Sequence, residues 1–142
     1  MTTSPTAYAK GSNIEARFNM AFAASIAGLA FGSSGLGAVH GLAYVVGTEY
    51  HLPHGRANAI MLPHVIDYNK LGNLRKFAQI AQAMGESITG LSTVEAAEKS
   101  VEAVKKLLGN LGVSSKLTDY KATKSNLTKL VKGGMAQSRL WG

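Results

Sequence analysis

The stretch from Phe18 to Thr48 carries no charged side chain when His40 is counted as neutral. A run of this length could span a bilayer, and its Gly37-x-x-x-Gly41 spacing also occurs in membrane helix pairs. However, Gly32-Ser33-Ser34-Gly35 lies in the middle of the run, and such a sequence breaks a helix. We therefore predict two shorter buried helices here, with a membrane span as the alternative reading.

The composition is that of one folded domain. The chain has 142 residues, of which 46% are hydrophobic, so it can build a core of ordinary size. It contains no cysteine, which excludes disulfides, thiolate metal sites and a cysteine nucleophile. The first residues, MTTSPTAYAKGSN, lack the apolar segment of a secretory signal. These features fit a cytoplasmic protein, and we expect no membrane segment.

Positive charge gathers toward the C-terminal end of the chain. The net charge is +7, and lysines from residue 99 to 132 face few acids. Such a surface could hold nucleic acid, or it could be a solvated helical face or one that meets an acidic partner. Because no aromatic residues interleave with these lysines, no platform for stacking bases is predicted. We therefore expect no nucleic-acid partner.

The spacing of apolar residues predicts helices throughout. Ser12 and Ser92 each stand three residues before a glutamate, and both patterns are capping boxes that open a helix. Helices are expected at about 13–31, 36–46, 54–68, 74–84, 93–108 and, more weakly, 126–137. No segment alternates with the period of two that a strand requires. The fold class predicted is thus all-α, a bundle of five to six helices, with residues 1–11 as a loose tail and 12–142 as one domain.

Four histidines lie within a short span, and two of them are candidate metal ligands. His40 falls in the middle of an apolar helix, where a buried imidazole needs a partner. A metal ion would supply that partner, but so would a backbone carbonyl, and the residues alone favour the carbonyl. His54 follows Pro53 at a helix start, where the helix dipole disfavours protonation and so favours the neutral form that binds metal. Taken alone, it is better interpreted as an exposed histidine at a helix start.

The remaining donors give no complete site. His51 and His54 could chelate together, but Pro53 between them places His51 in the preceding loop. For His64, packing or a hydrogen bond is the expected role. The only acids between Arg17 and Glu86 are Glu49 and Asp67, and neither has a spacing that compels ligation. A catalytic Zn²⁺ or Fe²⁺ usually has three protein ligands and an open position. The residues therefore predict half a metal site.

Other catalytic signatures are absent from the sequence. There is no Gly-x-Gly-x-x-Gly between a strand and a helix, and no Ser-His-Asp set has recognisable spacing.

Several short motifs occur together between residues 27 and 69. They are Ala-Gly-x-Ala-Phe at 27–31, Gly-Leu-Gly-x-x-His at 35–40, Pro-His-Gly-x-x-Asn-Ala at 53–59, Leu-Pro-His-Val at 62–65 and Tyr-Asn at 68–69. Together they closely resemble the signature of the iron-containing (group III) alcohol dehydrogenases. The similarity extends over nearly the whole chain. It implies the C-terminal helical domain of the dehydroquinate synthase-like fold that this family shares.

The resemblance also implies a metal and a coenzyme. In the family, an N-terminal α/β domain binds NAD or NADP, and the helical domain holds Fe²⁺ or sometimes Zn²⁺ with one aspartate and three histidines. By motif, two of these histidines fall on His40 and His54. The aspartate and the third histidine belong to an earlier helix, which we expect to be absent here together with the coenzyme-binding domain. Phe31 and Tyr44 are the expected cofactor-binding residues, and Phe31 would also line the substrate wall.

Two departures from the family pattern are visible. Many members have a histidine where this chain has Tyr44, which puts any proton-relay role of that position in doubt. The chain also stops at residues 138–141, close to where the family usually continues into an Asn-Pro segment and a final helix.

The function implied is hydride transfer between NAD(P) and a small alcohol, aldehyde or ketone. The metal would act as a Lewis acid on the substrate oxygen. With the coenzyme domain missing, this chain is expected to be inactive alone and to need an N-terminal domain or split subunit as partner, and a homo-oligomer is expected. The alternative is a non-catalytic, truncated helical module that associates with itself through the surface left bare.

Overall fold

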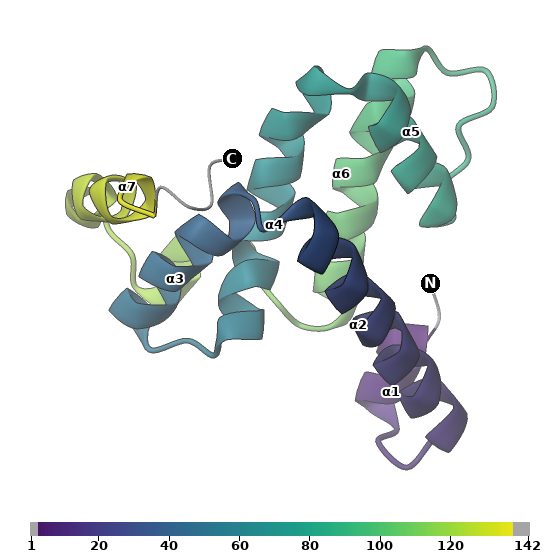
Figure 1. Cartoon of the computed structure of the whole chain (residues 1–142), viewed down its shortest axis with the longest axis horizontal. Coiled ribbons are helices and arrows are strands. Elements are labelled where there is room, and N and C mark those ends of the chain that lie inside the picture. Colours follow the sequence, from purple (N-terminus) through teal and green to yellow (C-terminus); the bar gives the residue numbers. More distant parts are fainter. Residues whose placement is uncertain (1–2, 138–142) are drawn as a thin grey trace. The chain divides into compact units, whose positions relative to one another are not determined.

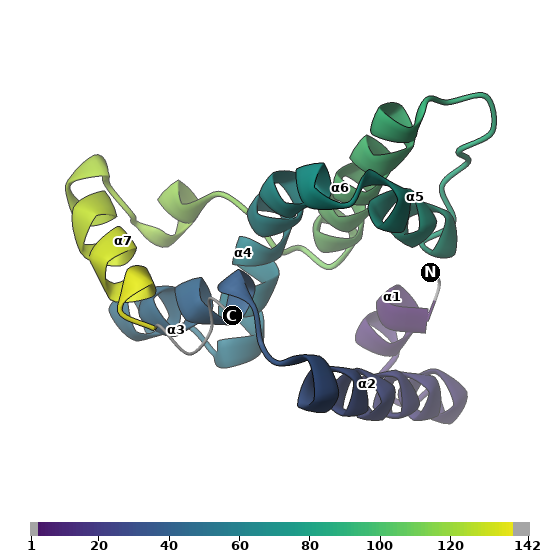
Figure 2. The same ribbon diagram turned by 45° about the horizontal axis from the view of Figure 1, so that its top comes forward.

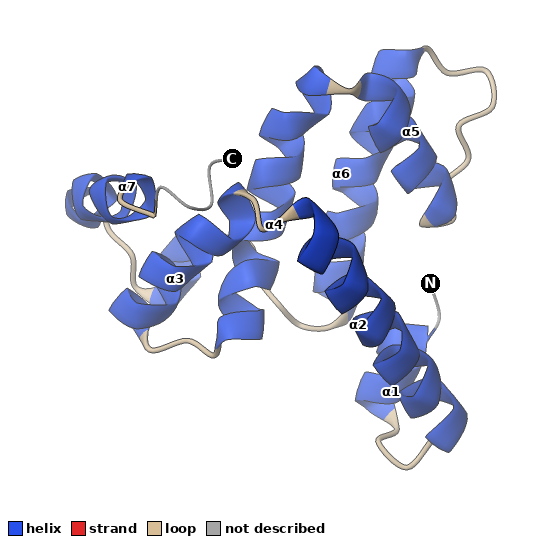
Figure 3. Cartoon of the chain, in the orientation of Figure 1, coloured by secondary structure: helices blue, strands red, loops and turns tan. Residues whose placement is uncertain are grey.

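A computed structural model describes residues 3–137, and every regular element in this range is helical (Figure 3). The α-helices are α1 (Thr3–Ala9), α2 (Ile14–Ser34), α3 (Ala38–Tyr50), α4 (His54–Asn69), α5 (Leu74–Ala83), α6 (Thr93–Asn110) and α7 (Leu127–Met135). Short 3₁₀ helices cover Lys70–Gly72, Leu117–Tyr120 and Lys124–Asn126. The predicted all-helical class is confirmed, with one helix more than expected. The predicted departure at residues 138–141 lies outside the described range.

The chain divides into two compact units, Met1–Leu36 and Gly37–Gly142. The layout expected from the sequence, a tail over residues 1–11 and one domain over 12–142, stays a prediction. The observed division falls beside Gly35, whose φ of 77° ends α2. A positive φ is easily reached by glycine and rarely by other residues, so the helical path stops at this position.

The first unit consists of α1 and α2, which lie alongside each other (Figure 1). Residues 3–9 form a helix where the sequence predicts a loose tail. Contact with α2 stabilises this short segment, including the hydrogen bond from Ser4 Oγ to Met20 Sδ at 3.2 Å. The cap of α2 is Asn13 rather than the expected Ser12, because the Asn13 side chain accepts a hydrogen bond from the Ala16 N–H at 3.0 Å.

Helix α2 runs three residues beyond its predicted end at Phe31. The hydroxyls of Ser33 and Ser34 bond back to the Ala30 carbonyl at 3.0 and 2.9 Å, so these serines are accommodated within the helix. Within the first unit only Ala16 of α2 is buried, so α1 alone does not provide the burial predicted for this helix. Burial requires a covering partner, and α1 is too short to cover this face.

The second unit is built around α4. Helix α3 packs on one side of α4 and α6 on another, α5 pairs with α6, and α7 returns to pack on α3 (Figure 2). One core cluster joins α3, α4 and α7 through a set of buried side chains: Ala43, Val46, Ala57, Ile60, Met61 and Leu130. Removing a side chain such as Ile60 from water contributes roughly 1.5–3 kcal/mol. This core fixes the positions of α3 and α4, the helices that carry the candidate site.

Two local features shape the α3–α4 connection. Helix α3 continues past Gly47, where the sequence predicts its end, and stops at His51, whose φ is 52°. Pro53 then caps α4 with an extended backbone, so His54 is the first residue of that helix. Pro63 lies inside α4 and is buried.

Helix α6 begins with the predicted capping box. The Ser92 hydroxyl accepts from the Glu95 N–H, and the Glu95 carboxylate accepts from the Ser92 N–H at 2.8 Å. Hydrogen bonds from Ser92 lower the pKa of the Glu95 carboxyl. Within residues 3–137 no single helix is both long and apolar enough to cross a membrane; only α2 and α3 taken together, with a break between them, reach that length and composition.

Candidate metal centre

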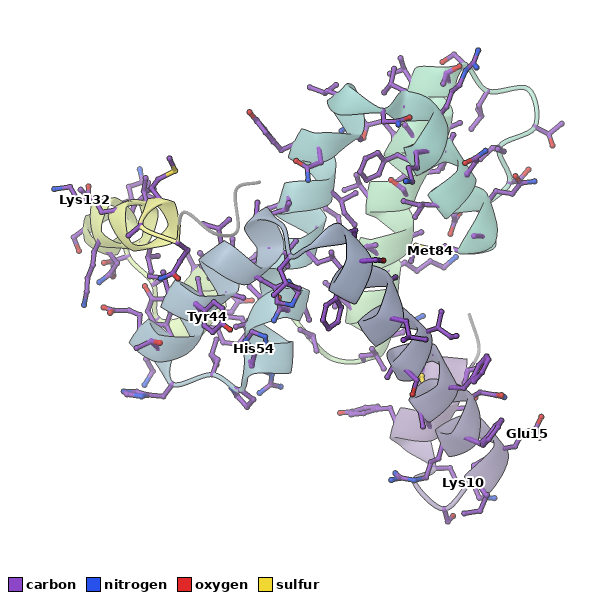
Figure 4. All side chains as sticks on the ribbon, viewed as in Figure 1. Lys10, Glu15, Tyr44, His54, Met84 and Lys132 are labelled. Carbon is purple, nitrogen blue, oxygen red and sulfur yellow. The ribbon has the colours of Figure 1, made fainter. Side chains whose placement is uncertain are left out.

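The structure brings His40 and His54 together from two helices of the second unit. His40 is the third residue of α3 and His54 the first of α4, and their ring centres lie 5.5 Å apart with an interplanar angle of 47°. Tyr44, one turn after His40, has its ring centre 5.3 Å from that of His54 (Figure 4). Three of the four predicted site residues therefore form one cluster.

The spacing of the two imidazoles suits a shared cation. Two imidazoles on one tetrahedral ion, with metal–nitrogen bonds of roughly 2.1 Å, have ring centres about 5 Å apart. The observed separation of 5.5 Å is close to this value, so a small side-chain adjustment would let both rings ligate one ion. The donor type also fits, because neutral imidazole binds Fe²⁺ and Zn²⁺ well.

The electrostatics of the pair favour the neutral form of His40. This side chain is half-buried, and burial lowers the pKa of its imidazole below the ordinary value. The neighbouring His54 lowers the pKa of His40 further, because two positive charges this close repel each other. The proton therefore does not compete strongly with a metal for this ring at neutral pH.

Asn58 is a hydrogen-bonding partner of His54. It lies one turn further along α4, and its Nδ2 is 3.0 Å from both the Nε2 and the carbonyl oxygen of His54. Sequence reasoning includes Asn58 in a family motif but assigns it no role. The available signal is its spacing, since residues four apart on a helix lie on the same face.

The other donors of the sequence are engaged elsewhere. His51 is in the left-handed conformation beyond the end of α3, as its predicted loop position requires. His64 lies 2.8 Å through Nε2 from the Ser115 carbonyl, which confirms the predicted hydrogen bond. Glu49 pairs with Lys129 at 2.6 Å, and Asp67 pairs with Lys70.

Within the part of the chain that the structure describes, no three His, Cys, Asp or Glu side chains gather closely enough to hold a metal ion. The assignment of His40 and His54 as metal ligands stays a prediction, and the described residues add no third donor beside them.

A hollow of about 350 Å³ opens beside the pair. It is lined by Ala43, Tyr44, Gly47, Thr48, Leu52 and His54. A second, open groove of about 520 Å³ lies between α3 and α7 and shares Tyr44 and Thr48 with the first. Tyr44 therefore stands between the two hollows, with half of its surface exposed. Phe31 belongs to α2 in the first unit, and its predicted role stays a prediction.

An all-helical unit that brings together two imidazoles from the first turns of successive helices is what the resemblance to the iron-containing alcohol dehydrogenases leads us to expect. The sequence profile of the Fe-containing alcohol dehydrogenase family, C-terminal, matches residues 1–141. The chain belongs to this family.

Individual relatives agree with this assignment. The chain is 51% identical to the 1,3-propanediol dehydrogenase of Klebsiella pneumoniae over 80% of its own length and 29% of that protein. It is 39% identical to the NAD-dependent methanol dehydrogenase of Bacillus methanolicus, over 90% of this chain and 34% of the relative.

Solved structures show the same fold. A crystal structure of 1,3-propanediol oxidoreductase matches with a TM-score of 0.91 and 42% identity, over 96% of this chain and 36% of that one. The alcohol dehydrogenase of Oenococcus oeni matches with a TM-score of 0.92 and 34% identity, over 97% of this chain and 36% of its own. The chain thus spans about a third of the length of these relatives.

Proposed function

We propose that this chain supplies two metal ligands, His40 and His54, to an NAD(P)-dependent alcohol dehydrogenase that interconverts an alcohol with an aldehyde or ketone. The observation that carries the proposal is the meeting of the two imidazoles, 5.5 Å apart between ring centres, from helices fixed by one core. The family supports Fe²⁺ as the metal, with Zn²⁺ as the alternative.

A bound divalent metal would act as a Lewis acid on the substrate oxygen. The protein's own contribution is to hold the ligands and shape the space beside them. Burial lowers the pKa of the His40 imidazole, and the core around Ile60 keeps α4 against α3. The hollow between Tyr44 and Leu52 gives a small alcohol or aldehyde a place next to His54, and the Tyr44 ring forms one wall of it.

The remaining parts of the reaction are assigned to a partner. The described residues around the pair include no third ligand, and NAD or NADP requires a binding site of its own. We propose that both come from a polypeptide segment equivalent to the other two thirds of the relatives' length. The chain alone is then expected to hold metal weakly and to show no turnover.

Metal binding by the chain alone is the direct test. Cobalt(II), a spectroscopic substitute for Zn²⁺ and Fe²⁺, is titrated into the wild type and into His40→Ala and His54→Ala. Each variant should bind at least about tenfold more weakly, because each loses one of two nitrogen donors. His51→Ala is the matched control and should bind as the wild type does. Equal affinity in all four proteins would refute the ligand assignment.

The enzymatic part is tested by complementation. The chain is mixed with an N-terminal fragment of a propanediol dehydrogenase, and alcohol-dependent reduction of NAD is followed by absorbance. Activity is expected only in the mixture and should be lost with His54→Ala. Turnover by the chain alone would contradict the need for a partner.

A second candidate, a non-catalytic module that associates with itself, rests on one feature of α2. Its large apolar side chains are exposed, among them Phe18 at 67%, Phe22 at 60% and Leu29 at 73%. An apolar stripe of this kind invites association. Light scattering after size exclusion decides this: a homo-oligomer that disperses when Phe18 and Phe22 are replaced by serine would support it, whereas a monomer at high concentration would exclude it.

A further inference from the structure

The amide of Asn58 has an orientation that its two contacts determine. Its Nδ2 lies 3.0 Å from the His54 carbonyl oxygen, which can only accept a hydrogen bond. The atom at that position must therefore be the amide nitrogen, since an amide oxygen there would face another acceptor. The same nitrogen lies 3.0 Å from His54 Nε2, so the second amide hydrogen points to the ring.

This orientation selects one tautomer of His54. Because the amide nitrogen only donates, Nε2 must carry a lone pair, and in the neutral ring the proton is then on Nδ1. A free histidine side chain favours the opposite form, with the proton on Nε2. A metal ion that binds through Nε2 requires the Nδ1–H form, which is the form that Asn58 selects.

The amide oxygen of Asn58 indicates that this residue does more than stabilise the fold. Within the described part of the chain, Asn58 Oδ1 is buried and has no hydrogen-bond partner. A buried polar atom of this kind reduces stability. An apolar side chain of similar shape would avoid the loss, so asparagine is not the most stabilising residue here. An apolar side chain would, however, lose the two N–H contacts that Asn58 makes with His54.

We propose that Asn58 is a positioning residue that presents the Nε2 lone pair of His54 for a divalent cation. The proposal builds on the metal-binding function proposed above. A cation that takes this lone pair replaces the hydrogen bond from the amide, while the bond from Asn58 Nδ2 to the His54 carbonyl can persist and keep the side chain in place.

The tautomer is measured directly in the metal-free full chain. Long-range ¹H–¹⁵N correlation spectra, recorded at a pH of about 8, separate protonated from lone-pair nitrogens in each imidazole. His54 should show a lone pair at Nε2 and a proton at Nδ1. His64 is an internal reference: its Nε2 faces the Ser115 carbonyl, so it should carry the proton on Nε2.

Two substitutions at Asn58 should reverse the pattern. In Asn58→Leu the ring loses its donor and should shift toward the Nε2–H form, without loss of melting temperature. In Asn58→Asp the carboxylate accepts a hydrogen bond from Nε2, so His54 should become wholly Nε2–H. If the leucine variant does not fold, the aspartate variant tests the proposal. Asn69→Leu, at the exposed end of the same helix, should leave His54 unchanged.

Wild-type His54 with its proton on Nε2, or the same tautomer in wild type and both Asn58 variants, would overturn the proposal. Cobalt(II) titration adds a second reading: Asn58→Leu should bind about two- to fivefold more weakly, because only the minority of its His54 rings with the proton on Nδ1 can then bind the cation. A changed tautomer with unchanged cobalt affinity would also overturn it. If the wild type shows the expected tautomer but binds no cobalt, the metal function fails while the effect of Asn58 on His54 stands.

Discussion

Helices α2 and α4 are both rich in apolar residues, yet only α4 buries them. Helix α2 has one buried residue, Ala16, whereas α4 buries five: Ala57, Ile60, Met61, Pro63 and Val65. The difference lies in the number of partners within each unit, because α2 packs on the short α1 while α4 packs on both α3 and α6. Apolar content therefore predicts a surface that needs covering, and the topology of the unit decides whether it is covered.

The candidate site follows the same division. His40, Tyr44 and His54 all belong to the unit with the continuous core, and the site's positions therefore depend on that core. A site built on well-packed helices keeps its geometry better than one on a segment with few contacts.

The largest expected difference between the two helices is in the cost of losing a large side chain. Ile60→Ala removes a side chain with no exposed surface and should lower the free energy of unfolding by about 3 kcal/mol. Phe22→Ala changes a side chain that is 60% exposed and should cost less than about 0.5 kcal/mol. Urea unfolding followed by NMR signals from each unit measures both, and equal losses would contradict the comparison.

Replacing a glycine by alanine should lower the stability of the second unit but raise the stability of the first. At Gly133 in α7 a Cβ would lie 2.9 Å from Val45 Cγ1, so Gly133→Ala should push α7 off α3 and cost about 1–2 kcal/mol. At Gly28 in α2 nothing lies within 4 Å, so Gly28→Ala should stabilise the helix by about 0.5–1 kcal/mol. The melting temperatures of the two variants should move in opposite directions; a fall in both would show that α2 is covered.

Loss of a cap tests whether each helix unfolds with its unit. Ser92→Ala removes the box that opens α6 and should lower the free energy of unfolding by about 1 kcal/mol. Asn13→Ala removes a similar bond from α2, but with so few packing contacts the effect should be local fraying. Amide hydrogen exchange separates the two results. Faster exchange confined to the first turns of α2 is expected, and exchange that rises across the second unit would argue against it.

Acid should weaken the second unit slightly through Asp67. The hydrogen bond from Lys70 lowers the pKa of this carboxyl, so its contribution is fully present above about pH 4 and is lost as the pH falls through the lowered value. Because Asp67 is 55% exposed, the effect should stay below about 1 kcal/mol. Asp67→Asn should show a smaller fall in stability between pH 5 and pH 2, by about this amount, in urea titrations. An unchanged pH profile would exclude this contribution.

The parts of the site predicted from sequence are those with strong local signals. Motifs of a few residues predict three such features: the capping box at Ser92, the loop position of His51 and the close approach of His40 and His54. The hydrogen bond of His64 was predicted as a type of contact, but its partner Ser115 lies 51 residues away, and local spacing does not encode such a pairing.

The parts that could not be predicted depend on contacts between elements. Residues 3–9 are too few to form a stable helix alone, so α1 exists through its contact with α2. The exposure of α2 could not be read from its apolar pattern, which is the pattern of a core helix. The contacts by which Asn58 orients His54 depend on the rotamers of both side chains. The spacing of the two residues shows only that they lie on the same face of α4.

Gly47 lies in the last turn of α3, and its carbonyl accepts a hydrogen bond from the Leu52 N–H in the connection to α4. A Cβ at this position would be 3.3 Å from the Leu52 carbonyl oxygen and 3.6 Å from Ala57 Cβ. A larger residue would thus displace the connection that sets where α4 begins, and with it the imidazole at its first position. The distance between the two candidate ligands therefore depends on the absence of a side chain at Gly47, which is not itself a ligand.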